Sequence, residues 1–178
     1  SMPMTGPGTG RSKTADIAGA GTSKGNNLQD NQGLLYEWRI NLKTGLVAER
    51  TLSEIPCDFT RVNDNFACYP TRYLYAGVFN TERPFTFDGI MKYDNDTGVT
   101  TEFQYGVNRH GGEAVFAPRA GAGSEDDGYL VCFIHDEAKN QSECLIIDAQ
   151  NLSAGPVATV IMPFRVPYGF HAGWVSGE

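Results

Sequence analysis

Three glycine turns recur at a nearly constant interval along this 178-residue chain. Gly45, Gly98 and Gly155 lie 53 and 57 residues apart, and each closes a polar turn between two runs of strand-forming residues. Two further strand-like runs separate successive hairpins. A repeat of about 50 residues that contains several short strands is typical of β-propeller blades. We therefore predict an all-β fold, a partial β-propeller of two to three blades.

The strand-like runs are short and are separated by turn residues, as in other all-β proteins. The first hairpin joins LYEWRINL to LVAERTL through the turn KTG. No helical hydrophobic period of any length is present, so we expect no helix beyond a turn or two. The expected strands lie near residues 35–42, 46–52, 72–79, 88–93, 99–105, 113–118, 128–135, 143–148 and 156–162.

The composition supports the all-β prediction and excludes several classes of function. With 21 Gly, 9 Pro, 10 Phe and 8 Tyr, it suits a turn-rich β protein. A formal charge of −7 and a pI near 4.9 argue against nucleic acid or an anionic membrane as the main partner. There is no run of about 18 apolar residues, so we expect no transmembrane segment. No secretory signal is visible at the N-terminus.

Two regions of the chain differ sharply in composition. Residues 1–30 are rich in Gly, Ser, Thr and Asn and contain few large apolar side chains. Such a segment buries too little apolar surface to offset the entropy of ordering its backbone. We predict a disordered tail or linker over residues 1–30 and one folded region over residues 31–178.

The spacing of the cysteines indicates whether the protein resides in a reducing or an oxidising compartment. Cys57, Cys68, Cys132 and Cys144 are spread along the sequence and form no Cys-x-x-Cys pair. We interpret them as buried or partly buried free thiols rather than as disulfides or zinc ligands. A reducing compartment follows from this interpretation, and we expect a cytoplasmic protein.

Three residues suited to metal or acid–base chemistry occupy equivalent positions of the repeat. Asp58, Glu113 and His171 each lie at the start of an expected first strand, 55 and 58 residues apart. The first strand of a propeller blade lines the central channel, so all three side chains are expected to approach the axis. Two carboxylates and an imidazole there form a candidate site. The alternative is that both carboxylates are strand-end caps or ion-pair partners of Arg61 and Arg119.

The segment around His171 is extended and aromatic. Pro163 and Pro167 lack amide donors, which excludes a paired central strand over this stretch. A neutral imidazole has two ring nitrogens to satisfy, and metal ligation is one common way to do so. A core histidine packed beside Phe170 and Trp174 is the simpler interpretation, and the segment alone does not decide between the two.

Several segments, taken together, resemble the C-terminal third of the carotenoid cleavage dioxygenases. Within this family, the resemblance favours the bacterial and fungal apocarotenoid and lignostilbene dioxygenases. The matching segments are CDFTRVN before RYLYAGVF, GGEAVFAPR before EDDGYLVCFIHDE and ECLIIDAQNL, and RVPYGFHAGW. They cover residues 34–178 in the order and spacing of the family. The resemblance implies the last two to three blades of a seven-bladed propeller.

The resemblance also implies a cofactor and its ligands. Enzymes of this family hold one non-haem Fe(II) on the propeller axis through four histidines, three of which are oriented by glutamates. They use O2 to split a conjugated carbon–carbon double bond into two carbonyl products. His171 matches the C-terminal iron ligand, and Glu113 matches a glutamate that orients a ligand. Asp58 stands where the family has Glu in a Glu-Phe-Pro-Arg motif, and Thr60 replaces the proline, so the shorter carboxylate is expected to stop short of its imidazole.

The other three iron histidines of the family have no match here. His110 and His135 do not fall at ligand positions, and we interpret both as surface or structural residues. The chain thus supplies one iron ligand of four, and alone it is expected to be inactive and to bind iron weakly. The implied partners are O2, an apolar conjugated substrate and the missing N-terminal part of the propeller.

The function predicted from the resemblance is the C-terminal portion of an Fe(II) dioxygenase that cleaves carotenoid, apocarotenoid or stilbene-like substrates. The alternative is a non-catalytic propeller fragment that serves binding or assembly. A partial ring leaves blade faces without neighbours, and exposed apolar strands associate. We expect those faces to carry the rows Leu130, Cys132 and Ile134, and Leu145 and Ile147.

Overall fold

The computed structural model describes residues 33–83, 86–175 and 177. The tail expected over residues 1–30 lies outside the described residues and stays a prediction. Within the described part, strands dominate, and the helices are two 3-10 turns, Asp64–Phe66 and Leu152–Ala154. None of the described helices is long and apolar enough to cross a membrane. The prediction of an all-β chain is confirmed.

The described residues contain ten strands, which form one continuous antiparallel sheet. In chain order they are β1 (Leu34–Ile40), β2 (Val47–Arg61), β3 (Tyr73–Phe79), β4 (Phe87–Asp94), β5 (Val99–Gln104), β6 (Arg109–Gly111), β7 (Val115–Pro118), β8 (Gly128–Asp136), β9 (Gln141–Asp148) and β10 (Pro156–Ile161). The pairing order along the sheet is β1-β2-β3-β4-β6-β8-β9-β10, while β5 pairs with β4 and β7 pairs with β8.

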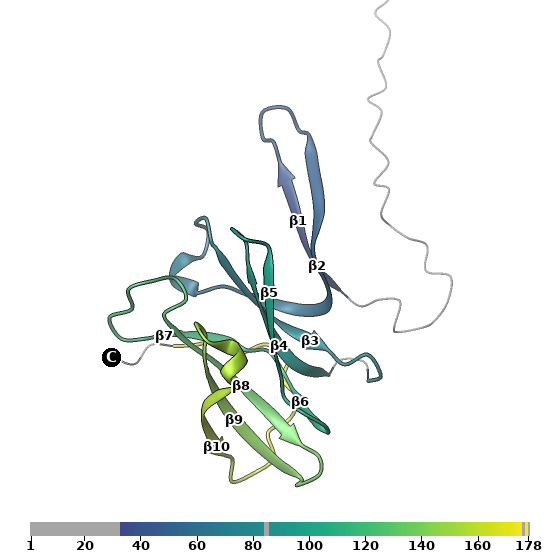
Figure 1. Ribbon diagram of the computed structural model, residues 1–178, viewed down its shortest axis with the longest axis vertical. Coiled ribbons are helices and arrows are strands. Elements are labelled where there is room, and N and C mark those ends of the chain that lie inside the picture. The colour runs from purple at the N-terminus through teal and green to yellow at the C-terminus, as the bar shows by residue number, and fades with distance from the viewer. Residues whose placement is uncertain (1–32, 84–85, 176, 178) are drawn as a thin grey trace, which may run out of the picture.

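This pairing defines two four-stranded blades and the outer part of a third. We call the end of β2 with β3, β4 and β5 the first blade, and β7 to β10 the last blade. The hairpin of β1 and the start of β2 projects away from both (Figure 1). Short β6 joins the blades by pairing with β4 on one side and β8 on the other. The chain is a partial β-propeller, as predicted.

The nine expected strands are present with small shifts at their ends, and two features differ from the prediction. β2 continues for 15 residues, from the outer hairpin into the inner edge of the first blade. The β1–β2 pairing shifts register between Thr51 and Pro56 of this strand. β6 was not predicted because its three residues, Arg-His-Gly, carry no hydrophobic alternation.

The main hydrophobic core lies between the two blades. Its buried members come from both blades and from the segments that join them: Tyr75, Ile90, Tyr105, Ala114, Phe116, Leu130, Cys132, Ile134, Leu145, Ile147, Ala149 and Leu152. Burial of one large apolar side chain contributes roughly 1.5–3 kcal/mol, so this interface contributes strongly to stability. The expectation that the row from Leu130 to Ile134 and the pair Leu145 and Ile147 face outward is therefore wrong. These residues are at most 2% exposed because they pack on the first blade.

The opposite face of the last blade is the one left open. Val131, Phe133, Cys144, Ile146 and Val160 share this face through the cross-strand pairs of β8, β9 and β10. Phe133 is 43% exposed and Val160 is 50% exposed. We call these five residues the open face.

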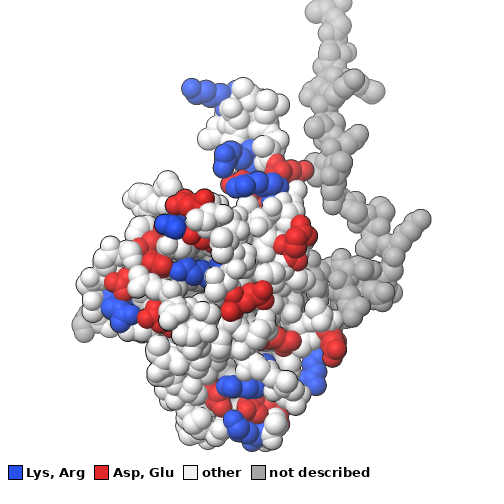
Figure 2. All heavy atoms as spheres, viewed as in Figure 1, with Lys and Arg blue, Asp and Glu red and all other residues white. Residues whose placement is uncertain are grey.

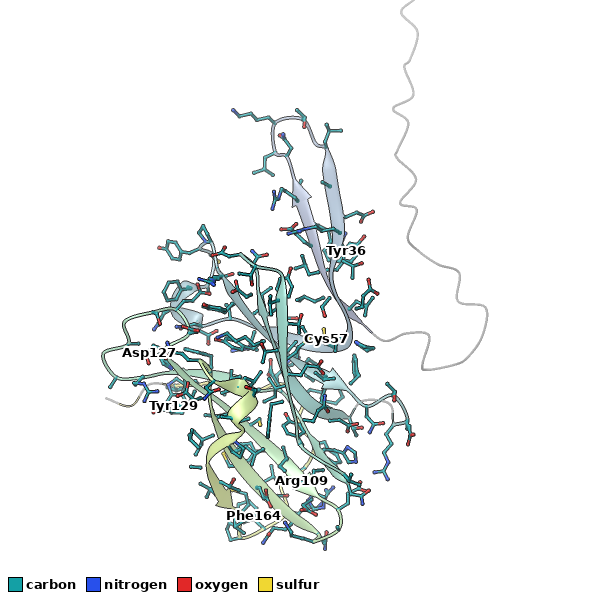
Figure 3. The ribbon with its side chains drawn as sticks, viewed as in Figure 1. Tyr36, Cys57, Arg109, Asp127, Tyr129 and Phe164 are labelled. Atoms are coloured by element: carbon teal, nitrogen blue, oxygen red, sulfur yellow. The ribbon has the colours of Figure 1, made fainter. Side chains whose placement is uncertain are left out.

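A second, smaller core fixes the projecting hairpin to the first blade. It contains Leu35, Cys57, Ala76, Val78, Met91 and Tyr93. Cys57 lies at the base of the hairpin, where β2 enters the body of the molecule (Figure 3). Its amide donates to the carbonyl of Gly33 at 2.9 Å, which closes the base.

Acidic and basic side chains are interspersed over the face of the molecule in Figure 2.

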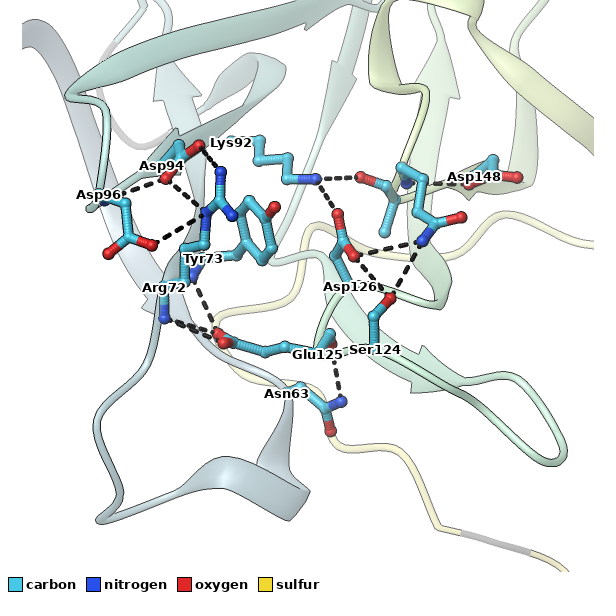
Figure 4. A network of polar contacts seen from close by, with 12 residues as sticks. Asn63, Arg72, Tyr73, Lys92, Asp94, Asp96, Ser124, Glu125, Asp126 and Asp148 are labelled. Atoms are coloured by element: carbon cyan, nitrogen blue, oxygen red, sulfur yellow. Dashed lines mark hydrogen bonds and ion pairs between the residues drawn. The ribbon is translucent and has the colours of Figure 1, made fainter.

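Polar contacts also join the blades (Figure 4). Lys92 on β4 lies 2.7 Å from the Asp126 carboxylate and donates to the carbonyl of Ala149 at 2.8 Å. The Glu125 carboxylate accepts hydrogen bonds from the amides of Arg72 and Tyr73, each at 2.9 Å. The loop that precedes β8 therefore holds both the start of β3 and the middle of β4.

Candidate functional site

The site is built by the C-terminal segment, residues 162–175, which leaves the last blade and returns to its inner end. The segment is tied to β9 at its start, because the amide of Val166 donates to Oγ of Ser142 at 2.9 Å. The same hydroxyl lies 3.1 Å from Nδ1 of His135. The ring of Tyr168 then meets the His135 ring edge-on, with centroids 6.4 Å apart. These contacts anchor the segment before it reaches His171.

The structure brings Glu113 and His171 together. The Glu113 side chain is 3% exposed, and its Oε2 accepts a hydrogen bond from the amide of Ala172 at 2.6 Å. The same oxygen lies 3.6 Å from Nδ1 of His171, whose side chain is 77% exposed. The approach predicted from the repeat spacing is thus found, and the imidazole presents its other nitrogen away from the carboxylate.

Arg61 is the second partner of this carboxylate. Its Nη1 lies 3.6 Å from Oε1 of Glu113 and its Nη2 lies 3.3 Å from Asp64. The pairing of Glu113 with Arg119 that the alternative interpretation offered is not found, because Arg119 pairs with Asp127 and Asp148. Glu113 therefore does take part in an ion pair, and its partner is Arg61 at the end of β2, the inner strand of the neighbouring blade.

An aromatic side chain that the sequence analysis missed flanks the imidazole. The ring of Phe59 lies 5.0 Å from the ring of His171 and 6.1 Å from that of Phe170. Phe59 has a φ of 55°, in the left-handed region, beside the register shift between Asp58 and Arg61. The irregular strand turns this ring toward the site, a feature that hydrophobic alternation does not encode.

Asp58 does not join the pair in the described part of the chain. Its side chain is exposed, and Oδ1 accepts a hydrogen bond from the amide of Phe59 at 2.7 Å. No contact between Asp58 and an imidazole is found among the described residues. The role of Asp58 in orienting a ligand stays a prediction.

The other two histidines are structural. His110 and His135 are 6% and 5% exposed, so of the two predicted alternatives, surface or structural, both residues take the structural one. Nδ1 of His110 lies 2.6 Å from the Asp88 carboxylate, and His135 contacts Ser142 as described above. Both rings are held by polar partners, and the two residues are direct cross-strand neighbours on β6 and β8.

The four cysteines are free thiols, as expected. Burial raises the pKa of Cys57 to about 11 and that of Cys132 to about 12. Burial also raises the pKa of the half-buried Cys144. Cys68 is exposed, contrary to the prediction, because it lies in a turn after a 3-10 helix with a φ of 68°.

The geometry fits one imidazole ligand of a metal rather than a complete metal site. In the described part of the chain, no three His, Cys, Asp or Glu side chains are grouped to hold an ion. A ligating imidazole commonly gives its second N–H to a carboxylate, which fixes the tautomer and the ring angle. His171 has such a carboxylate at Nδ1 and an exposed ring, so its Nε2 is the nitrogen available to a metal.

Comparison with known proteins gives the family of the chain. The family model described as retinal pigment epithelial membrane protein, RPE65, matches residues 7–176. The chain belongs to the RPE65/carotenoid cleavage dioxygenase family. Among its relatives, the chain is 39% identical over 169 residues to a carotenoid 9,10(9',10')-cleavage dioxygenase of Crocus sativus, covering 85% of the chain. It is 40% identical over 157 residues to one of Arabidopsis thaliana, covering 81% of the chain.

Solved structures of this family share the fold. The cobalt-substituted apocarotenoid oxygenase of Synechocystis matches 82% of the chain with a TM-score of 0.77 and 29% identity. The match covers 31% of that oxygenase. The chain likewise spans 30% of the Crocus relative and 29% of the Arabidopsis relative. It thus corresponds to less than a third of a carotenoid cleavage dioxygenase.

Proposed function

We propose that this chain forms the C-terminal blades of a non-haem Fe(II) dioxygenase that oxidatively cleaves a conjugated carbon–carbon double bond to two carbonyl products. The observation that carries the proposal is the Glu113 carboxylate placed 3.6 Å from Nδ1 of the exposed His171. Membership of the carotenoid cleavage dioxygenase family supports the reaction class.

In this proposal the residues of the chain prepare one ligand. Glu113 holds the proton of His171 on Nδ1, so that the lone pair on Nε2 faces the metal. Arg61 offsets the charge of the buried carboxylate, and Phe59 packs beside the imidazole and restricts its rotation. Fe(II), when bound, supplies the activation of O2.

The remaining ligands come from elsewhere in the propeller. One imidazole does not hold Fe(II) against water, so the chain alone is inactive and binds iron weakly. The partner is the N-terminal part of the propeller, in the same polypeptide or in another. The open face supports this assignment, because an apolar sheet face of this kind is covered by the next blade in a closed ring.

The substrate is an apolar conjugated molecule of the carotenoid, apocarotenoid or stilbene type. Phe59 and Phe170 lie beside the imidazole, and Phe170 and Trp174 are 65% and 45% exposed. Apolar and aromatic side chains of this kind line the sites of elongated apolar ligands. The relatives named for carotenoid and apocarotenoid cleavage support the same substrate class.

Four free thiols support a reducing, cytoplasmic location.

Reconstitution tests the proposal. The chain is produced joined to, or together with, the segments that complete its propeller, and iron content and O2-dependent cleavage of an apocarotenoid and of a stilbene are measured. We expect about one iron per propeller and aldehyde products from at least one substrate. A closed, folded propeller without iron or product contradicts the proposal and favours the non-catalytic binding module.

A further inference from the structure

The C-terminal segment touches the start of the last blade at a contact between two backbones. A Cβ atom built on Gly112 would lie 2.9 Å from the carbonyl oxygen of Gly169 and 3.6 Å from its nitrogen. On the sheet side, the amide of Gly112 donates to the carbonyl of Phe133 at 3.3 Å. Gly112 is therefore held between β8 and the segment, with no room for a side chain.

Each glycine of this contact lies close in the sequence to one residue of the candidate site. Gly112 immediately precedes Glu113, and Gly169 lies two residues before His171. The next contact along the segment is the hydrogen bond from the amide of Ala172 to Glu113. A shift of the segment at Gly169 therefore moves His171 and Ala172 relative to the carboxylate.

The two glycines are not equivalent. A Cβ atom on Gly169 would meet no heavy atom within 4 Å, and neither residue has a backbone in the left-handed region. An alanine is thus compatible with the backbone conformation at both positions. Only at position 112 does the added methyl group meet the opposing backbone.

We propose that Gly112 is a positioning residue for His171. The missing side chain lets the C-terminal segment approach the blade closely enough for Glu113 to bond the Ala172 amide and to face the imidazole. The proposal rests on the proposed function only in treating the positioned imidazole as a metal ligand. The positioning itself is a property of the metal-free chain.

Hydrogen exchange measured by mass spectrometry on the whole chain tests the positioning. Gly112→Ala is compared with Gly169→Ala and with Gly123→Ala, whose added Cβ also meets no atom within 4 Å. In Gly112→Ala, we expect the peptide that contains Ala172 to exchange about tenfold faster than in the unsubstituted chain, while the β8 peptide stays protected. The two control variants keep the original protection in both peptides.

A spectroscopic readout separates positioning from general stability. In the metal-free chain with 15N-labelled histidine, the His171 ring shows Nδ1 protonated beside Glu113, and Gly112→Ala shifts it toward a free tautomer mixture. Unchanged exchange and an unchanged His171 spectrum in Gly112→Ala overturn the proposal. Loss of the whole fold in this variant also overturns it, because the added methyl group is expected to displace the segment and not the sheet.

Metal binding is a separate measurement. Co2+ is added to the reconstituted propeller, and its binding is followed by absorption. Loss of segment protection in Gly112→Ala together with weaker Co2+ binding supports both proposals. If the segment loses protection but the unsubstituted propeller binds no Co2+, Gly112 still positions His171 and the proposed function is the part that fails.

Discussion

Arg61 and Glu113 meet across two neighbouring blades, with Nη1 of the guanidinium 3.6 Å from Oε1 of the carboxylate. The Glu113 side chain is 3% exposed, whereas that of Arg61 is 25% exposed. A carboxylate buried to this degree requires compensating partners, which are here the guanidinium and the Ala172 amide. The pair ties the inner strand of the first blade to the start of the last blade, and the hydrogen bond from Ala172 ties Glu113 in turn to the C-terminal segment.

Removal of both partners of this pair should cost less than the sum of the two single removals. We expect Arg61→Gln and Glu113→Gln each to lower the free energy of unfolding by about 1–3 kcal/mol, because each leaves the other group incompletely paired. The double variant should lose less than the sum of the two. Urea unfolding at one fixed protein concentration gives the three values. Strictly additive losses would show that the two side chains do not interact.

The pairing of Arg72 with Asp94 gives a pH dependence with a defined sign. The Arg72 guanidinium, at 2.7 Å, holds the pKa of Asp94 well below its usual range. The ionised carboxylate therefore stabilises the fold above the unfolded-state pKa of about 3.9, and this contribution is lost as the pH falls through the folded-state value. The contribution is small, because the Arg72 side chain is 42% exposed and solvent screens the pair.

Asp94→Asn should accordingly lower the melting temperature at pH 7, and the difference from the unsubstituted chain should shrink below about pH 3. The asparagine retains the Oδ1 acceptor for the amides of Asp96 and Thr97. Asp96→Asn is the control, since that side chain is 69% exposed and 3.5 Å from Arg72. A difference that grows toward acid pH would reverse the assigned sign.

The thiols should differ in reactivity. Cys68 is exposed, whereas Cys57 and Cys132 are buried with pKa values raised to about 11 and about 12. At pH 8 the native chain should react quickly with Ellman's reagent at Cys68, more slowly at Cys144, and at all four thiols only after unfolding. Cys68→Ser should remove the fast phase. A fast phase that persists in this variant would mean that the core around Cys57 or Cys132 opens readily.

The open face should make the isolated chain associate. Phe133 and Val160 are about half exposed on it. We expect Phe133→Gln combined with Val160→Gln to weaken self-association about tenfold in sedimentation velocity. Val107→Gln, which changes a loop residue that is 89% exposed, is the control. A monodisperse monomer of the unsubstituted chain would contradict the assignment.

The repeat in the sequence was sufficient to predict the strands and the approach of Glu113 to His171. Turn glycines at regular spacing placed the hairpins, and the interval from Glu113 to His171 placed both at the inner ends of their segments. Positions equivalent within a repeat converge on the axis because the blades are arranged around it. Asp58, the third equivalent position, does not contact this pair, and a register shift changes the local backbone beside it.

Which face of a strand becomes buried could not be predicted from the sequence. Alternation in β8 shows that Leu130 and Val131 point to opposite sides, but not which side meets another blade. The structure buries Leu130 completely and leaves Val131 on the open face. Phe59 was missed for a related reason, since its direction depends on a left-handed backbone at an irregular strand.

The role of His171 as a metal ligand is tested most directly by iron analysis of the reconstituted propeller. Unsubstituted protein, His171→Ala and His110→Asn are purified and their iron is measured per propeller. His110 contacts Asp88 outside the site, so His110→Asn is the matched histidine control. We predict iron near one per propeller in the unsubstituted protein and the control, and a loss of about tenfold or more in affinity in His171→Ala. Full iron occupancy in His171→Ala with unchanged affinity would contradict the assignment of His171.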